Sequence, residues 1–153
     1  MAHRTQHSPA GEGLELTAPD AVLTVKVDAA HTDGTYEVFE VSAPRGPATP
    51  QHRTGWGKSY YVLFGRMIVQ VDDRAFDVGP GAVVVIPPEA LHTFTVLTPM
   101  VTFLVVSEGR AMGAFHADLS ATVPHERPLD EVQSELRQVL SRHAVSFGAG
   151  VPS

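Results

Sequence analysis

The sequence predicts an all-β fold, a small antiparallel barrel or jelly roll with one helix near the C-terminal end. Short runs rich in β-branched and aromatic residues, separated by turn-forming residues, follow one another from Leu14 to Val106. One later stretch, Pro128 to His143, instead repeats apolar residues at helical spacing. The 153 residues suit one domain with a substantial core, and no repeat of fixed period is visible.

The chain begins with residues 1–13, a polar segment with Gly and Pro but no periodicity, which we expect to be a disordered tail. A single domain then covers residues 14–153, with the barrel at about 14–108. The predicted strands are the runs LELT, AVLTVKV, TYEVFEVS, SYYVLFG, MIVQV, AVVVIP, HTFTVL and MVTFLVV. Residues that tolerate tight turns separate several of these runs and predict hairpins or corners at 31–34, 71–74 and 79–81.

After the barrel we expect a helical extension at about 110–147 that contains one amphipathic helix, docked outside the barrel. Acidic residues lie early in the stretch Pro128 to His143 and Arg142 lies late, as the helix dipole favours. The apolar positions at helical spacing are Leu129, Val132, Leu136, Val139 and Leu140.

Composition excludes several classes of partner. The net charge is −6 and Lys and Arg form no cluster, so we expect binding to neither nucleic acid nor an anionic membrane. There is no cysteine, so any metal would need nitrogen and oxygen donors. No apolar run is long enough for a secretory signal or a membrane span, and we expect a cytoplasmic protein.

Two motifs carry a family resemblance. The segment GPATPQHRTGWGKSYYVLFG places His52 six residues after Gly46 and continues to Gly65, and GAVVVIPPEALHTFTV runs from Gly81 to His92. With these spacings the chain, from Asp33 onward, resembles the single-domain cupins related to quercetin dioxygenase. The resemblance implies a cupin double-stranded β-helix, which is a jelly-roll barrel.

The resemblance also implies a metal site of three histidines and a glutamate, and here His52 and His92 match two of those four ligands. Thr54 stands in place of a histidine and Lys58 in place of the glutamate. Two imidazoles are a poor site for a divalent cation and an ammonium repels it, so we expect no metal cofactor. The alternative is iron, nickel, copper or zinc bound by His52 and His92, with Glu89 or a deprotonated Lys58 as a further donor.

Strand alternation predicts which side chains enter the barrel. His52 and Thr54 share one face, as do His92, Phe94 and Val96. If the strand after Trp56 begins at Lys58, then Lys58, Tyr60 and Val62 point inward. A slip of one residue would instead bring Ser59 and Tyr61 inside, and the register of the family favours Lys58.

We therefore expect an enzyme that performs metal-independent acid/base chemistry on a small, mostly apolar molecule, such as a natural-product or polyketide intermediate. His52 or His92 would remove a proton next to a carbonyl, Lys58 would stabilise the oxyanion, and Tyr60 or the other histidine would reprotonate. The reaction would be an isomerisation, a cyclisation or a lyase step. The predicted ligand-contacting residues are Thr54, Trp56, Phe94, Met67 and Phe103.

Simpler readings stay open for these residues. Lys58 covers apolar surface with its stem, Tyr60 is a wall of the barrel, and Trp56 either stacks on a flat ligand or rests on the rim. Two alternative functions stay open as well: a metal-dependent cupin dioxygenase or isomerase, and a cupin that binds a small molecule without catalysis. His116, His125 and His143 lie outside both motifs and are expected at the surface. We also expect a homodimer formed through Leu14 to Val27.

Overall fold

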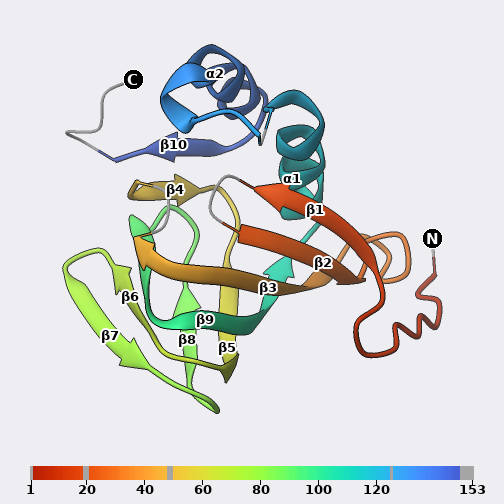
Figure 1. Ribbon diagram of the computed structural model, residues 1–153. Coiled ribbons are helices and arrows are strands. Elements are labelled where there is room, and N and C mark those ends of the chain that lie inside the picture. Colours follow the sequence, from red (N-terminus) through yellow and green to blue (C-terminus); the bar gives the residue numbers. More distant parts are fainter. Residues whose placement is uncertain (1, 19–20, 48–49, 125, 149–153) are drawn as a thin grey trace.

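The computed structural model describes residues 2–18, 21–47, 50–124 and 126–148. The structure is mostly β, and all its strand pairs are antiparallel (Figure 1). The strands are β1 (Leu14–Ala18), β2 (Ala21–Val27), β3 (Tyr36–Pro47), β4 (His52–Thr54), β5 (Lys58–Phe64), β6 (Met67–Val71), β7 (Arg74–Val78), β8 (Val83–Ile86), β9 (His92–Glu108) and β10 (Val145–Phe147). The helices are α1 (Ala111–Thr122), the short 3-10 helix η1 (Leu129–Glu131) and α2 (Gln133–Arg142).

Strand β9 organises the sheet. It has 17 residues and pairs with β3, β4, β5 and β6, so it joins the two predicted runs on either side of Pro99 into one strand. The order β1-β2-β3-β9-β4-β10 forms one path through the sheet, and β7 and β8 add to β6 and β5. The inward side chains of these strands form the core of the molecule.

The predicted inward register of β5 is confirmed. Lys58, Tyr60 and Val62 are 7%, 5% and 1% exposed, whereas Tyr61 is 42% exposed. The turns also follow the sequence: β6 and β7 pair from Val71 to Arg74 around a two-residue hairpin loop. Its first loop residue, Asp72, has a positive φ of 53°, a conformation that aspartate tolerates better than most residues.

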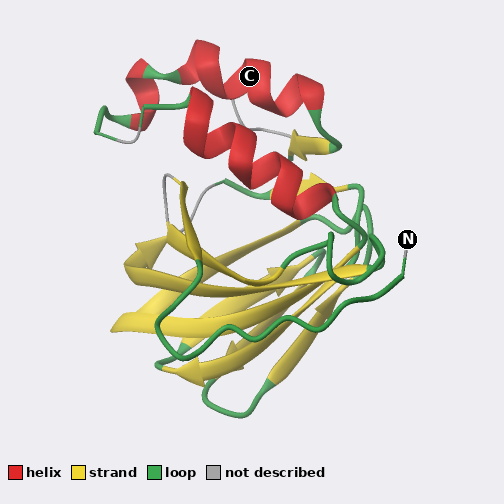
Figure 2. Ribbon diagram, turned by 90° about the vertical axis from the view of Figure 1, so that its right-hand side faces the viewer, coloured by secondary structure: helices red, strands yellow, loops and turns green. Residues whose placement is uncertain are grey.

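The prediction of one C-terminal helix was wrong, because the structure has two α-helices. Helix α2 falls within Pro128 to His143, but α1 precedes it and was not predicted. Both helices lie on one side of the strands (Figure 2). Buried side chains from both helices cover an opening of the barrel. In α1 the buried residues Met112, Phe115 and Leu119 have helical spacing, yet Gly113 weakens the helical signal of the sequence.

Helix α1 is held to the sheet at its first turn. The buried carboxylate of Glu37, on β3, accepts a hydrogen bond of 3.0 Å from the backbone N–H of Gly113. Burial raises the pKa of Glu37, while this hydrogen bond lowers it. A Cβ atom at position 113 would collide with the same carboxylate, which explains why glycine stands inside the helix.

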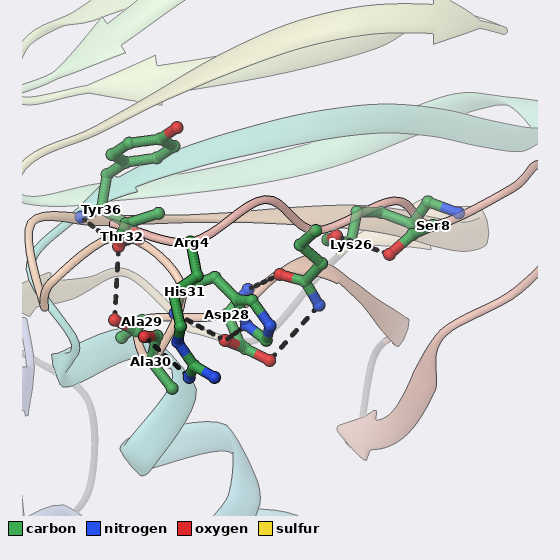
Figure 3. Close-up of polar contacts among 10 residues, drawn as sticks. Arg4, Ser8, Lys26, Asp28, Ala29, Ala30, His31, Thr32 and Tyr36 are labelled. Carbon is green, nitrogen blue, oxygen red and sulfur yellow. Dashed lines mark hydrogen bonds and ion pairs between the residues drawn. The ribbon is translucent and has the colours of Figure 1, made fainter. Parts of the chain in front are cut away.

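The N-terminal segment runs beside β2 and the loop that follows it (Figure 3). The backbone N–H of Arg4 donates to the carbonyl of His31 (2.8 Å), and the Ser8 hydroxyl donates to the carbonyl of Lys26 (2.8 Å). The side chain of Gln6 accepts from the backbone N–H of Asp28 (2.9 Å). The disorder expected for residues 1–13 stays a prediction. A disordered segment would lack the three hydrogen bonds given above.

Candidate functional site

A cavity lies between the inner faces of the strands and the two helices. It holds about 870 Å³ of space, counting its open mouth. Its walls are mostly apolar and include six aromatic side chains. The aromatic residues are Trp56, Tyr60, Phe94, Phe103, Phe115 and Phe147.

His52 and His92 lie side by side at this cavity, with 4.3 Å between their ring centroids. They are paired residues of β4 and β9, which explains how two motifs forty residues apart in the chain meet. Nδ1 of His52 contacts the carbonyl of Pro50 (3.1 Å), and Nδ1 of His92 contacts the carbonyl of Ala90 (2.9 Å). A carbonyl can only accept, so each Nδ1 carries the hydrogen and each Nε2 keeps a free lone pair.

Both imidazoles are neutral at physiological pH. Burial and, to a lesser extent, the positive charge of Lys58 lower the pKa of His52 to about 4. Burial lowers the pKa of His92 to about 2, again with contributions from Lys58 and from His52. His52 lines the cavity. His92 is 1% exposed and packs against the His52 ring, outside the set of residues that line the cavity.

Lys58 is the buried cation of the site. Its Nζ atom lies 5.5 Å from the centroid of the Tyr60 ring, and both residues line the cavity from β5. The Tyr60 ring in turn packs on Phe94 and Phe103, with centroid distances of 6.4 Å and 4.8 Å. Lys58 therefore brings a positive charge to a cavity wall that is mostly apolar and aromatic.

Thr54 and Trp56 also line the cavity. The Thr54 hydroxyl donates to the carbonyl of Trp56 (3.0 Å), so it shapes the turn between β4 and β5. Trp56 is 6% exposed, and its ring contacts Phe115 of α1 at 6.1 Å between centroids. Of the predicted ligand-contacting residues, Met67 is fully buried but lies outside the set that lines the cavity.

The helices contribute a part of the site that the sequence motifs did not indicate. His116 lines the cavity from α1, next to Phe115 (4.9 Å between ring centroids), and it does not belong to the surface where it was expected. Burial lowers the pKa of His116 to about 3, with smaller contributions from Lys58 and His52. The signal in the sequence was the helical spacing of Met112, Phe115 and Leu119, which carries His116 to the roof of the cavity.

An ion-pair network joins the two helices of this roof. Asp118 of α1 accepts two hydrogen bonds from Arg142 (2.8 Å and 2.9 Å) and contacts Nε2 of His143 (2.9 Å). The hydrogen bonds from Arg142 hold the pKa of Asp118 well below its usual range. The His143 ring packs on Phe115 and is partly buried, which corrects its expected surface position. His125 lies outside the described residues.

The donor set does not fit a divalent metal ion. Among the described residues, no group of three or more His, Cys, Asp or Glu side chains is close enough to hold one. The Thr54 hydroxyl is turned to a backbone carbonyl, and Lys58 supplies a positive charge where a cation would need a carboxylate. Glu89, the further donor considered above, is exposed at the surface.

The protein is thus a mostly β structure with an interior cavity covered by two helices. Comparisons with known proteins agree with the β fold. Residues 38–107 match the Cupin_2 family model, described as a cupin domain, and the match covers a little under half of the chain. A comparison with curated proteins finds no match. Within the described helices, none is long and apolar enough to cross a membrane.

Several solved structures have a similar fold. KdgF from Halomonas sp. is 17% identical, with a TM-score of 0.62, over 69% of this chain and 94% of that one. Streptomyces Pac13, solved with uridine, is 17% identical, with a TM-score of 0.58, over 69% and 83% of the chains. The polyketide cyclase RemF from Streptomyces resistomycificus is 25% identical, with a TM-score of 0.56, over 71% and 80%.

Proposed function

We propose that the protein is an enzyme that performs acid/base chemistry on a small, mostly apolar molecule in the cavity, without a metal ion. The observation that carries the proposal is the convergence of Lys58 and the neutral His52 on one mostly apolar cavity, with His92 packed against the His52 ring. Titratable groups with strongly shifted pKa values in a cleft are typical of active sites. RemF is described as a polyketide cyclase and Pac13 as a nucleoside dehydratase, which makes such chemistry plausible on this fold.

In the proposed reaction, Nε2 of His52 takes a proton from the carbon next to a ligand carbonyl. The electron pair of the broken C–H bond moves to the carbonyl oxygen, and the ammonium of Lys58 stabilises the resulting enolate. The anion also offsets the repulsion by which Lys58 lowers the pKa of His52, so the imidazole becomes a stronger base as the enolate forms. Return of the proton from His52 to another atom of the enolate completes an isomerisation. In a cyclisation the enolate carbon instead attacks a second carbonyl carbon of the ligand, and the proton goes to the alkoxide oxygen formed there. Where Tyr60 is the donor, it regains its proton from His52.

Hydrogen–deuterium exchange tests this step before the substrate is known. A set of apolar ketones and aromatic ketones is incubated with the protein in deuterium oxide, and loss of the proton next to the carbonyl is followed by NMR. We expect catalysed exchange for at least one compound, lost in His52→Gln and in Lys58→Met. Exchange that persists unchanged in both variants would contradict the assignment of roles.

The second candidate is a cupin that binds a small molecule without catalysis. The low pKa of His52, about 4, favours it, because such an imidazole is a weak base in the free protein. In that case the cavity binds ligands of the same chemistry, but no variant of His52 changes any exchange rate. The same experiment therefore separates the two candidates.

We also propose that the protein is a cytoplasmic homodimer that pairs through Leu14 to Val27. Strand β1 ends the path of strands in the sheet, and Leu14 at its start is 66% exposed, whereas the backbone N–H of Thr17 donates to the Ser120 hydroxyl of α1 (3.2 Å), so only the first part of this edge is available for pairing. A second apolar surface lies on β5 and β8, where Phe64 and Val85 are each 65% exposed. Crosslinking between single cysteines placed on β1 or on β8 tells which surface, if either, forms the dimer.

A further inference from the structure

Three buried polar atoms around the cavity lack a hydrogen-bond partner within the part of the chain that the structure describes. They are Nε1 of Trp56, Nε2 of His92 and Nδ1 of His116. Buried polar groups are nearly always hydrogen-bonded, so each exception requires an explanation. His92 packs against the proposed base His52, whereas Trp56 and His116 have no role so far.

Trp56 and His116 belong to the same part of the cavity wall, although they come from different elements. Trp56 lies in the turn between β4 and β5, and His116 lies on α1. Both rings contact Phe115, at centroid distances of 6.1 Å and 4.9 Å, and all three residues line the cavity. This part of the wall therefore holds two buried polar atoms that no described group of the protein hydrogen-bonds.

We propose that Trp56 and His116 form a second polar contact site, which hydrogen-bonds an oxygen of the ligand other than the one that meets Lys58. The ligand class that fits is an aromatic compound with two or more oxygen functions. This inference rests on the proposed function, because it assumes that the cavity binds a small molecule. It adds the chemical class of that molecule and two residues that select it.

The chemistry of the two side chains defines the match. An indole N–H can only donate, so Trp56 requires an acceptor such as a carbonyl or phenol oxygen. Neutral imidazole has one donor and one acceptor nitrogen, so His116 is able to pair with a hydroxyl group. The six aromatic side chains of the wall offer ring faces and edges to an aromatic ligand.

A purely structural role does not explain His116. An unpaired imidazole nitrogen in an apolar roof destabilises the folded protein, and leucine would fill the same space without that cost. If His116 serves the ligand, replacing it should preserve or raise the melting temperature and still weaken binding. A residue that served packing would show the opposite pair of effects.

Equilibrium dialysis with three probes of one shape tests the inference. The probes are naphthalene, a naphthol and a dihydroxynaphthalene with its hydroxyl groups on opposite rings. The wild-type protein should bind the dihydroxy probe about tenfold or more tighter than naphthalene, since each satisfied hydrogen bond is worth a factor of about ten. Trp56→Phe and His116→Leu should each remove about tenfold of that preference, while the affinity for naphthalene stays within about twofold.

Leu119→Met is the matched control, because Leu119 lines the same roof one turn further along α1 and has no polar atom. It should leave the preference for the dihydroxy probe unchanged. Equal affinity of the wild-type protein for naphthalene and the dihydroxy probe, or an unchanged preference in both variants, would overturn the inference and leave the proposed function standing. Failure of all three probes to bind would contradict both.

Discussion

Acidification should destabilise the protein steeply, because three histidines, the fully buried His92 and the partly buried His52 and His116, are neutral in the folded protein. In the unfolded chain each would take up a proton near pH 6.5, whereas the pKa values in the folded protein are about 4 for His52, 2 for His92 and 3 for His116. Keeping these histidines neutral therefore does not affect the free energy of unfolding above about pH 6.5, and it lowers that free energy as the pH falls below this value. Each residue should lower the free energy of unfolding by about 1.4 kcal/mol per pH unit.

The three contributions amount to about 3 kcal/mol between about pH 6.5 and about pH 5.5, because an unfolded histidine is only half protonated at the upper limit, and this is a large part of the 5–15 kcal/mol typical of a domain. The buried carboxyl of Glu37 acts in the opposite sense, since its raised pKa lets the folded protein bind a proton first. Asp28 and Asp118 have lowered pKa values and contribute only at more acidic pH.

Urea unfolding at a series of pH values from about 7.5 to about 5 measures this effect. His116→Leu removes one of the three groups, so its slope against pH should be about two thirds of the wild-type slope. Glu37→Gln should steepen the slope. A free energy of unfolding that stays constant over this range would refute the claim that the three imidazoles are neutral in the folded protein.

Three further predictions concern single substitutions and assembly. Glu89→Gly should raise the free energy of unfolding by about 1 kcal/mol in thermal or urea melts, because Glu89 has a φ of 69° that favours glycine; an equal or lower stability would contradict this. Gly113→Ala should lower the free energy of unfolding by about 1–3 kcal/mol, since the new Cβ atom meets the Glu37 carboxylate. Gly81→Ala is the comparison, because Gly81 has a positive φ but open space around it, so this variant measures the effect of the backbone conformation alone. Light scattering should give the mass of a dimer at micromolar concentration, and a monomer mass would remove the homodimer proposal.

The sequence predicted the strands and the inward register well, and the reason is physical. Alternation along β5 puts Lys58, Tyr60 and Val62 on one face and Ser59 and Tyr61 on the other, and the resemblance to the cupins indicated which face points inward. The same resemblance indicated that His52 and His92 meet, as the pairing of β4 with β9 confirms. The turn residues located the β6–β7 hairpin correctly.

The roof of the site was much harder to predict. Strand β10 has three residues and owes its existence to pairing with β4, a contact across about ninety residues of chain that no local pattern encodes. Helix α1 contains Gly113 and a mixed face, so its stability comes from packing on the barrel and from Glu37. His116 could not be placed in the site until α1 was placed over the cavity.

The central claim is that the site works with protein side chains and no metal ion, and one measurement on one sample tests it. Protein made without a chelating tag is dialysed against a chelator, and metal content and the deuterium exchange of the reactive ketone are determined on the same preparation. The account predicts undiminished exchange at a negligible ratio of metal to protein, and loss of exchange in Lys58→Met. Exchange that disappears with the metal, returns with one equivalent of iron, nickel, copper or zinc, and requires His52 for metal binding would contradict it.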